Sequence, residues 1–296
     1  MLDYPALAAV AAVLREGTFE RAALALGITP SAVSQRVRGM EERIGAILVI
    51  RGNPCLPTKL GLSLCAHFDR VRLLETDLAP DLALHADKER SRVPLKVAVN
   101  ADSLATWFPE AARSFGNTSS LPLHLVLDDE AYTGDRLRSG EVVAAVTADA
   151  RSVQGCRLVP LGSLRYAACA SPDFLARFFP HGISAAQLAE APCLRFDRRD
   201  GLQARWAREM YGIELDAPTY TVASTHAFID LAVNGLAWGM QPVQLAEPHI
   251  ADGRLVELDP KVRIDVKLNW IVAGLPIASI DHLTKAVRSS AQNALF

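Results

Sequence analysis

The first part of the chain carries three short runs of apolar positions at helical spacing, each ended by a glycine. The first run lies within residues 4–16, and the second begins after Thr18 and ends at Gly27. The third follows Thr29-Pro30-Ser31, where a hydroxyl can cap a helix and proline suits a first turn, and it ends at Gly45. The pattern predicts three helices, with a tight turn between the second and the third.

A short β-rich run follows these helices. It comprises Ile47-Leu48-Val49-Ile50 and leads into Arg51-Gly52-Asn53-Pro54, a sequence typical of a turn. Two short helices joined by a glycine turn, a basic third helix and a small hairpin are typical of a winged helix-turn-helix. We therefore expect a winged helix-turn-helix domain over residues 1–60.

From Thr58 onward, apolar residues recur every three or four positions and form one narrow stripe. The spacing predicts a long linker helix over residues 58–88 that pairs two copies of the chain. A helix packed on its own domain is the alternative. The stripe residues assigned to dimerisation are Leu60, Leu64, Phe68, Val71, Leu74 and Leu78.

After Pro94, short β-rich runs alternate with helical patterns, which predicts an α/β architecture with mostly parallel strands. The last strand, Val266 to Val272, and the last helix, Ile277 to Ala291, return to the first part of this region. We expect two lobes, with residues 94–163 plus 268–296 in the first and residues 164–267 in the second.

Composition narrows the class of protein. The chain has 296 residues, half of them hydrophobic, and a formal net charge of −2, which excludes wholesale disorder. No apolar run is long enough to span a membrane and the N-terminus lacks the basic start of a signal peptide, so we expect a cytoplasmic protein. From Arg21 to Lys59, however, the chain carries six basic residues and only two acidic ones, which gives a local positive patch.

No pattern indicates a metal site, a bound cofactor or an active site. The five cysteines and seven histidines are scattered without metal-ligand spacing, and the sequence contains no phosphate-binding glycine loop and no nucleophile elbow. We therefore expect no metal, no cofactor and no catalysis.

The helical head resembles that of the LysR-type transcriptional regulators. The resemblance lies in the run from Gly17 to Gly61, including Ala-Val-Ser-Gln-Arg-Val, Glu-Glu-Arg-Ile-Gly and the Pro-Thr-x-x-Gly entry to the linker helix. The runs from Ala98 to Trp107, Gly140 to Thr147 and Gly235 to Met240 are similar to the ArgP and LysG subgroup. That resemblance implies a regulator that senses lysine, arginine or a related amino acid and controls amino-acid export or metabolism.

Groove chemistry assigns roles within the head. The first turn of a recognition helix lies closest to base edges, and glutamine can pair with adenine through two hydrogen bonds. The expected base-reading residues are Thr29, Pro30, Ser31 and Gln35. The expected phosphate contacts are Ser34, Arg36, Arg38, Arg51 and Lys59. Alternatively, Arg36 and Arg38 pair with Glu41 or Glu42 along the helix, and we assign Arg43 to such a pairing rather than to DNA.

The resemblance also implies an effector domain of two lobes like those of periplasmic binding proteins, with a ligand between them. The Ser103 hydroxyl and nearby N–H groups would receive a carboxylate, and the acidic run after the strand at 121–127 would hold a cationic group. The expected effector-binding residues are Asn100, Ser103, Asp128, Asp129, Glu130, Thr147, Ser224, Thr225 and His226. Plain helix caps and a solvated acidic turn are the alternatives.

Two positions depart from the subgroup. His226 stands where the subgroup has glutamate, and Asn269-Trp270-Ile271 is more apolar than its counterpart. Both departures bear on which amino acid the cleft accepts, so an effector that is not basic, or no effector at all, is an alternative.

The expected partners are promoter DNA, an amino-acid effector and further copies of the chain, as a homodimer or homotetramer. RNA polymerase is a further partner that the resemblance allows. An alternative from another class is a solute-binding or enzymatic α/β domain whose helical head binds a protein. Salt dependence separates the two, because DNA binding weakens steeply with salt.

Overall fold

A computed structural model of the protein describes residues 2–78, 93–127 and 132–296. At the N-terminus, α1 (Tyr4–Glu16), α2 (Phe19–Leu26) and α3 (Pro30–Ile44) pack around one small core. The side chains of Asp3, Thr18 and Thr29 cap the three helices, and each helix ends at a glycine with a left-handed backbone. The capping residues thus define these three elements as the sequence predicts.

The wing consists of β1 (Val49–Ile50) and β2 (Leu56–Pro57), which pair antiparallel. It is held against α3 by Glu41, whose carboxylate accepts hydrogen bonds from the amides of Leu48 at 2.8 Å and Val49 at 3.2 Å. The expected winged helix-turn-helix is therefore present.

The linker helix α4 (Lys59–Leu78) starts directly at the wing. A Cβ at Gly61 would lie 2.2 Å from the carbonyl oxygen of Leu48, so only glycine allows the helix to pass this close. The Thr58 hydroxyl completes the junction, because it donates to the Ile47 carbonyl and accepts from the Gly61 amide. The predicted part of the helix beyond Leu78 lies outside the described residues.

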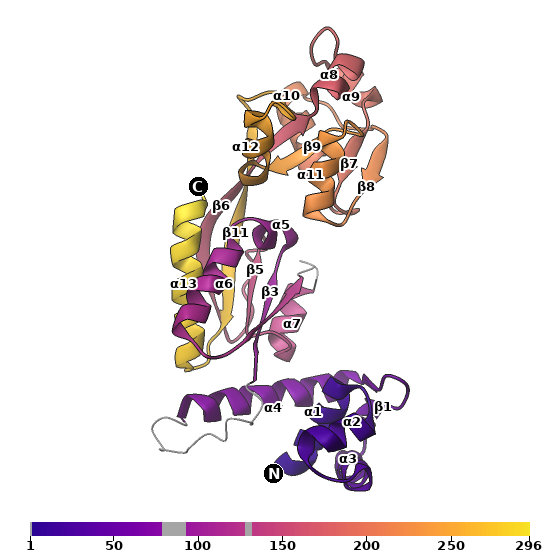
Figure 1. Cartoon of the computed structure of the whole chain (residues 1–296), viewed down its shortest axis with the longest axis vertical. Coiled ribbons are helices and arrows are strands. Elements are labelled where there is room, and N and C mark those ends of the chain that lie inside the picture. The colour runs from indigo at the N-terminus through magenta and orange to yellow at the C-terminus, as the bar shows by residue number, and fades with distance from the viewer. Residues whose placement is uncertain (1, 79–92, 128–131) are drawn as a thin grey trace.

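In the first lobe (lobe I), β3 (Leu95–Val99) lies between β4 (Leu123–Leu127) and β5 (Ala144–Thr147) and runs parallel to both. Helices α6 (Phe108–Thr118) and α13 (Ala278–Ala294) cover one face of this sheet and α7 (Thr133–Ser139) covers the other (Figure 1). The short helix α5 (Ala101–Ala105) follows β3 at the end of the lobe that faces the second one.

The second lobe (lobe II) contains five helices and four short strands. They are α8 (Pro172–Phe178), α9 (Ala185–Glu190), β7 (Cys193–Arg195), α10 (Leu202–Tyr211), β8 (Thr219–Thr221), α11 (Thr225–Val233), β9 (Gly239–Pro242), α12 (Val243–Ala251) and β10 (Val256–Glu257). Strands β7 and β8 are parallel, whereas β9 and β10 each pair antiparallel with β6 (Cys156–Ala170).

Two long strands join the lobes, β6 and β11 (Arg263–Ala273). They pair antiparallel from Cys156↔Ala273 to Ala167↔Arg263, with a register shift between Leu268 and Asn269. The expectation of mostly parallel strands is therefore wrong for this sheet, because the chain leaves lobe I on β6 and returns on β11. The proposed lobe boundaries, after residues 163 and 267, fall within these two strands.

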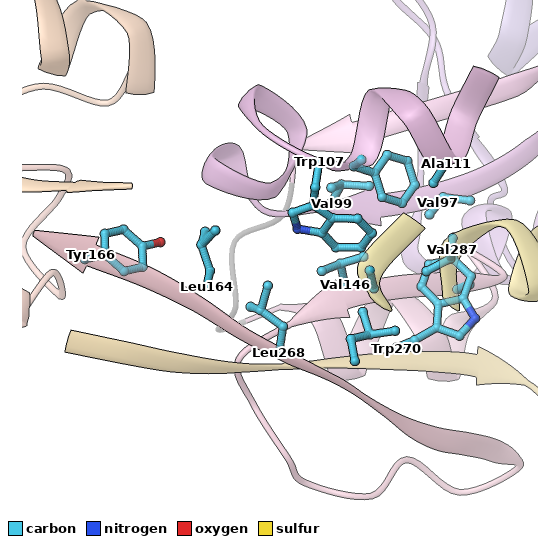
Figure 2. Packing of buried hydrophobic residues seen from close by; sticks show 14 of the residues in the cluster. Val97, Val99, Trp107, Ala111, Val146, Leu164, Tyr166, Leu268, Trp270 and Val287 are labelled. Carbon is cyan, nitrogen blue, oxygen red and sulfur yellow. The ribbon is translucent and has the colours of Figure 1, made fainter. Parts of the chain in front are cut away.

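The main hydrophobic core runs along the crossing strands into both lobes. Figure 2 shows Trp107, Val146 and Trp270 packed together in lobe I, with Leu164 and Tyr166 leaving β6 on one face. Because the same strands carry both the core and the inner wall between the lobes, packing of the core positions this wall.

The linker helix packs against both neighbouring domains. Leu64 and Phe68 contact the core of the DNA-binding domain, whereas Leu73 and Leu74 contact the core of lobe I. Much of the stripe assigned to dimerisation is thus packed within the same chain, while Leu60 and Leu78 at its two ends are exposed. The alternative of a helix packed on its own chain describes its central part.

Asp69, at the middle of the linker helix α4, forms ion pairs with both the DNA-binding domain and lobe I. Its carboxylate lies 2.8 Å from Lys96 Nζ on β3 and 3.7 Å from Arg15 on α1. Arg70 on the same helix donates to the carbonyl of Leu137 at 3.4 Å, and Asp77 accepts from the Ala278 amide at 3.1 Å. The DNA-binding domain is therefore connected to lobe I by polar contacts as well as by apolar packing.

This packing predicts unequal effects for two leucines on α4. Leu73 is 2% exposed and Leu62 is 46% exposed. Leu73→Ala should lower the free energy of unfolding by about 2–5 kcal/mol, and Leu62→Ala, its matched control, should change it by less than about 1 kcal/mol. Denaturant unfolding of both variants measures this, and equal small losses would mean that Leu73 is not packed on lobe I.

Candidate DNA-binding surface and effector cleft

Helix α3 presents a polar outer face over an apolar inner face. Val33, Val37 and Met40 are buried in the core of the head. The outer face carries every base-reading residue expected from the sequence, and all four are exposed: Thr29, Pro30, Ser31 and Gln35. The Thr29 hydroxyl also accepts the Ala32 amide at 3.2 Å, so it caps the helix.

The arginines of α3 differ in whether they form ion pairs. Neither Arg36 nor Arg38 forms an ion pair within the described ranges, so the alternative of pairing with Glu41 or Glu42 is not realised there. Arg43 pairs with Asp3 at 3.1 Å, which agrees with its assignment to an ion pair, although the partner lies on the loop before α1.

The remaining phosphate candidates lie beside α3. Arg51, on the wing, is exposed and its guanidinium lies 5.1 Å from the centre of the Phe19 ring. Lys59 is exposed at the start of α4, and Ser34 is half-buried on α3. Arg36, Arg38, Arg51 and Lys59 are thus all exposed on or beside α3.

A cleft of 780 Å³ lies between the two lobes. Lobe I contributes Asn100, Ala101 and Asp102, and the crossing strands contribute Tyr166 and Val266. Lobe II contributes residues from the loop before α10, from the start of α11 and from β9. The volume and the mixture of apolar walls and polar groups suit a molecule of amino-acid size.

Asp102 is the central polar residue of this cleft. Its carboxylate accepts a hydrogen bond from the Tyr166 hydroxyl at 2.6 Å and another from the Thr225 hydroxyl at 2.7 Å. Because Asp102 belongs to α5 and Thr225 to α11, the second bond joins the two lobes directly. Burial raises the pKa of the Asp102 carboxyl, the two hydroxyl donors offset part of this effect, and the nearby charge of Asp200 adds to it.

The other charged groups of the cleft are compensated. Arg151 pairs with Asp149 at 2.7 Å, Arg199 with Asp197 at 3.5 Å, and Arg205 with Glu209 at 2.8 Å. These pairs leave Asp102 without a cation among the described residues.

Asp200 is held differently from the paired aspartates. Its carboxylate accepts from the amides of Phe196 and Leu202 and from the Gln203 side chain. Three N–H donors thus stabilise its charge.

Only part of the expected effector set lines the cleft. Asn100 and Thr225 do, and Asn100 also caps α5 through the Ser103 amide. The residues Asp128, Asp129 and Glu130 lie outside the described residues.

Four other expected residues are absent from the cleft wall, and each absence has a physical reason. Ser103 is fully buried behind the start of α5, and Thr147 is buried and accepts the Asp149 amide. Ser224 caps α11 through the Ala227 amide, and His226 is exposed on that helix. These four residues are therefore not part of the cleft wall, and their contact with an effector stays a prediction.

Sequence reasoning missed Asp102, Tyr166 and Gln241 as cleft residues. Asp102 stood within the run used to identify the subgroup, and it directly follows a buried strand, which is the one local signal that could have selected it. Tyr166 and Gln241 lie in apolar strands, so only the tertiary structure places them in the cleft.

Comparison with known families agrees with this architecture. Residues 5–62 match the bacterial regulatory helix-turn-helix of the lysR family, and residues 88–289 match the LysR substrate binding domain. The chain belongs to the LysR family of transcriptional regulators.

The relatives of this LysR-family regulator are similar over nearly their whole lengths. The HTH-type transcriptional regulator ArgP of Pseudomonas aeruginosa is 43% identical over 273 residues, which cover 91% of this chain and 89% of that protein. The crystal structure of ArgP from Mycobacterium tuberculosis superimposes with a TM-score of 0.82 at 37% identity, covering 100% of this chain and 99% of the other. Full-length LysG from Corynebacterium glutamicum with bound effector Arg gives a TM-score of 0.71 at 34% identity, covering 99% of each chain.

Family membership confirms that the chain is a DNA-binding transcriptional regulator and not an enzyme with a protein-binding head. In the described part of the chain, no helix has both the length and the hydrophobicity to cross a membrane. The same residues contain no group of three or more side chains suited to hold a metal ion.

The raised pKa of Asp102 predicts a stability cost for the regulator without a ligand. The protonated carboxyl is favoured in the folded state, so this contribution is present at low pH and is lost as the pH rises through the folded pKa. Asp102→Asn keeps the shape and stays neutral, so its melting temperature should exceed that of the wild type at about pH 7, by less and less towards about pH 4. Thermal unfolding across this range measures the difference, and a difference that widens as the pH falls would contradict the sign.

Proposed function

We propose that this LysR-family regulator binds promoter DNA through α3 and the wing and senses a cationic amino acid in the cleft between its lobes. Its targets would be genes of amino-acid export or metabolism. It would act as a homodimer or as a homotetramer of paired dimers, with the exposed face of α4 contributing to pairing. RNA polymerase is the proposed partner in transcription control.

The observation that carries the effector class is the uncompensated carboxylate of Asp102. It lines the cleft without a cation among the described residues, while all three cleft arginines have acidic partners. A cationic ligand would supply the missing charge in a site that excludes much of the water. An anionic ligand would have to displace an existing ion pair.

The relatives support the same effector class. The LysG structure of Corynebacterium glutamicum contains arginine as its effector, and its chain is aligned with this one over 99% of both lengths. We infer by similarity that lysine or arginine is the effector of this regulator.

Recognition of DNA would divide between two groups of residues. Gln35, with Thr29, Pro30 and Ser31 before it, would read base edges in the major groove. Ser34, Arg36, Arg38, Arg51 and Lys59 would contact phosphates, which positions the duplex without selecting a sequence.

Ligand binding would reach the DNA through the contact of lobe I with the linker helix. A ligand shifts an equilibrium only if it binds two states with different affinity. Because Asp102 joins both lobes, a ligand bound to it favours one arrangement of the lobes. Asp69 and Leu73 would connect lobe I with the DNA-binding domain.

The division of DNA contacts predicts different effects for two exposed residues of α3. Gln35→Ala should weaken binding to the best operator by about 1–3 kcal/mol and relax sequence preference, while Arg38→Ala should weaken all sequences similarly and reduce the salt dependence. Titrations against the operator and a scrambled duplex at several salt concentrations measure both effects. An equal loss on both duplexes for Gln35→Ala would refute its role in base reading.

The effector class predicts selective binding of cations. Isothermal calorimetry on the full chain should detect L-lysine or L-arginine, and the uncharged analogue norleucine should bind at least about tenfold more weakly. A regulator that binds neutral amino acids more tightly would have a different effector. No heat with any amino acid would favour the effector-independent alternative.

A further inference from the structure

We propose that Phe19 is a positioning residue for DNA binding, because its ring holds the guanidinium of Arg51 in place beside the recognition helix. The inference rests on the proposed phosphate contact of Arg51 and adds the residue through which the protein prepares that contact. Binding by the wing then depends on an aromatic side chain of α2, a helix to which the sequence analysis assigned no contact with DNA.

The contact between these residues joins the wing to the start of α2. The Arg51 guanidinium lies over the Phe19 ring, 5.1 Å from its centre. A cation at this distance is attracted by the negative face of an aromatic ring. Phe19 is half-buried and packs on the core of the head, whereas Arg51 is exposed. The ring is therefore the fixed partner, and it restrains the arginine.

An aromatic partner leaves the N–H donors of Arg51 free. A guanidinium has several N–H donors in one plane, and a ring, unlike a carboxylate, occupies none of them with a conventional hydrogen bond. Within the described ranges, the Arg51 side chain forms no ion pair and no hydrogen bond. Arg43, in contrast, donates to the carboxylate of Asp3 at 3.1 Å. Arg51 is therefore restrained by a partner that does not compete with a phosphate for its donors.

Restraint of this side chain favours binding for an entropic reason. An exposed arginine has many rotamers, and fixing one of them on a phosphate costs conformational entropy. A ring that already restricts the side chain in the free protein reduces this cost when DNA binds. Phe19 would thus raise affinity without contacting the duplex.

The turn of the wing is fixed to the same part of the head. The Cys55 amide donates to the carbonyl of Gly17 at 2.7 Å, and a Cβ at Gly17 would lie 3.2 Å from the Cβ of Pro54. The wing is also bonded to α3 through Glu41. The start of α2, the wing and α3 therefore form one unit, in which the guanidinium keeps its position relative to the base-reading face.

The test measures binding of the full-length protein to a labelled random-sequence duplex, because phosphate contacts do not depend on sequence. Phe19→Leu and Phe19→Met keep an apolar side chain but remove the ring, and each should weaken binding about two- to fivefold. Phe19→Tyr keeps the ring and should bind within about 1.5-fold of the wild type. Phe178→Leu is the matched control, because it removes a ring that lies 4.9 Å from the Arg177 guanidinium in lobe II, and it should leave DNA affinity unchanged.

A double-mutant cycle separates positioning of Arg51 from a role of Phe19 in the core alone. In the Arg51→Ala background, Phe19→Leu should weaken binding by less than about 1.5-fold, since no guanidinium remains to be positioned. Arg51→Ala alone should reduce the salt dependence by about one phosphate contact, and Phe19→Leu should reduce it by less. Thermal unfolding verifies that each variant is folded. An equal loss from Phe19→Leu in both backgrounds would overturn the inference.

The failure of this inference differs from the failure of the proposed phosphate contact. If Arg51→Ala weakens binding and reduces the salt dependence while removal of the ring does neither, Phe19 is a core residue only and the contact of Arg51 stands. If Arg51→Ala changes neither quantity, the phosphate contact itself is wrong, and the inference is wrong with it.

Discussion

The antiparallel pairing of β6 with β11 is the constraint on which the effector domain depends. These strands carry the chain from lobe I to lobe II and back, and their apolar side chains form the continuous core of both lobes. The same strands place Tyr166 and Val266 at the inner wall of the cleft. A change in how the lobes face each other must therefore be absorbed near the register shift at Leu268 and Asn269, or by the loops beside the strands.

The ionisation of the buried Asp102 carboxylate is coupled to the arrangement of the two lobes. Asp102 bonds to the crossing strand through Tyr166 and to lobe II through Thr225, so its charge and the arrangement of the lobes depend on each other. Burial raises its pKa, and a cation in the cleft would favour the ionised form. The residue that binds the effector in our proposal would thus destabilise the empty domain, which is a common cost at functional sites.

The sequence predicted the DNA-binding domain in detail because its signals are local. Capping hydroxyls at Thr18 and Thr29 and glycines at helix ends act within one turn of the chain, so short-range patterns define these helices. Strand β6 was harder, because Pro160 and Gly162 interrupt its pattern and only pairing with β11 makes it one long strand. The alternation of strands and helices along the sequence predicted a mostly parallel sheet. That prediction failed because the sequence pattern does not show that β11 returns antiparallel to β6.

The DNA-binding surface and the effector cleft also differ in how far local sequence patterns predict them. The exposed face of α3 follows from helical periodicity, whereas Asp102, Tyr166 and Thr225 come from distant parts of the sequence and meet only in the folded domain. Ser103 and Ser224 have hydroxyls at the positions expected from helix starts, but one is buried behind its helix and the other caps. A local pattern identifies a helix start, and the packing of the lobes decides which side chain reaches the cleft.

The most direct test of this account is a crystal structure of the full-length regulator grown with L-arginine. The account predicts arginine between the lobes, with one of its nitrogens within about 3.2 Å of the Asp102 carboxylate. Arginine bound elsewhere in the cleft, with Asp102 still contacted only by Tyr166 and Thr225, would contradict it.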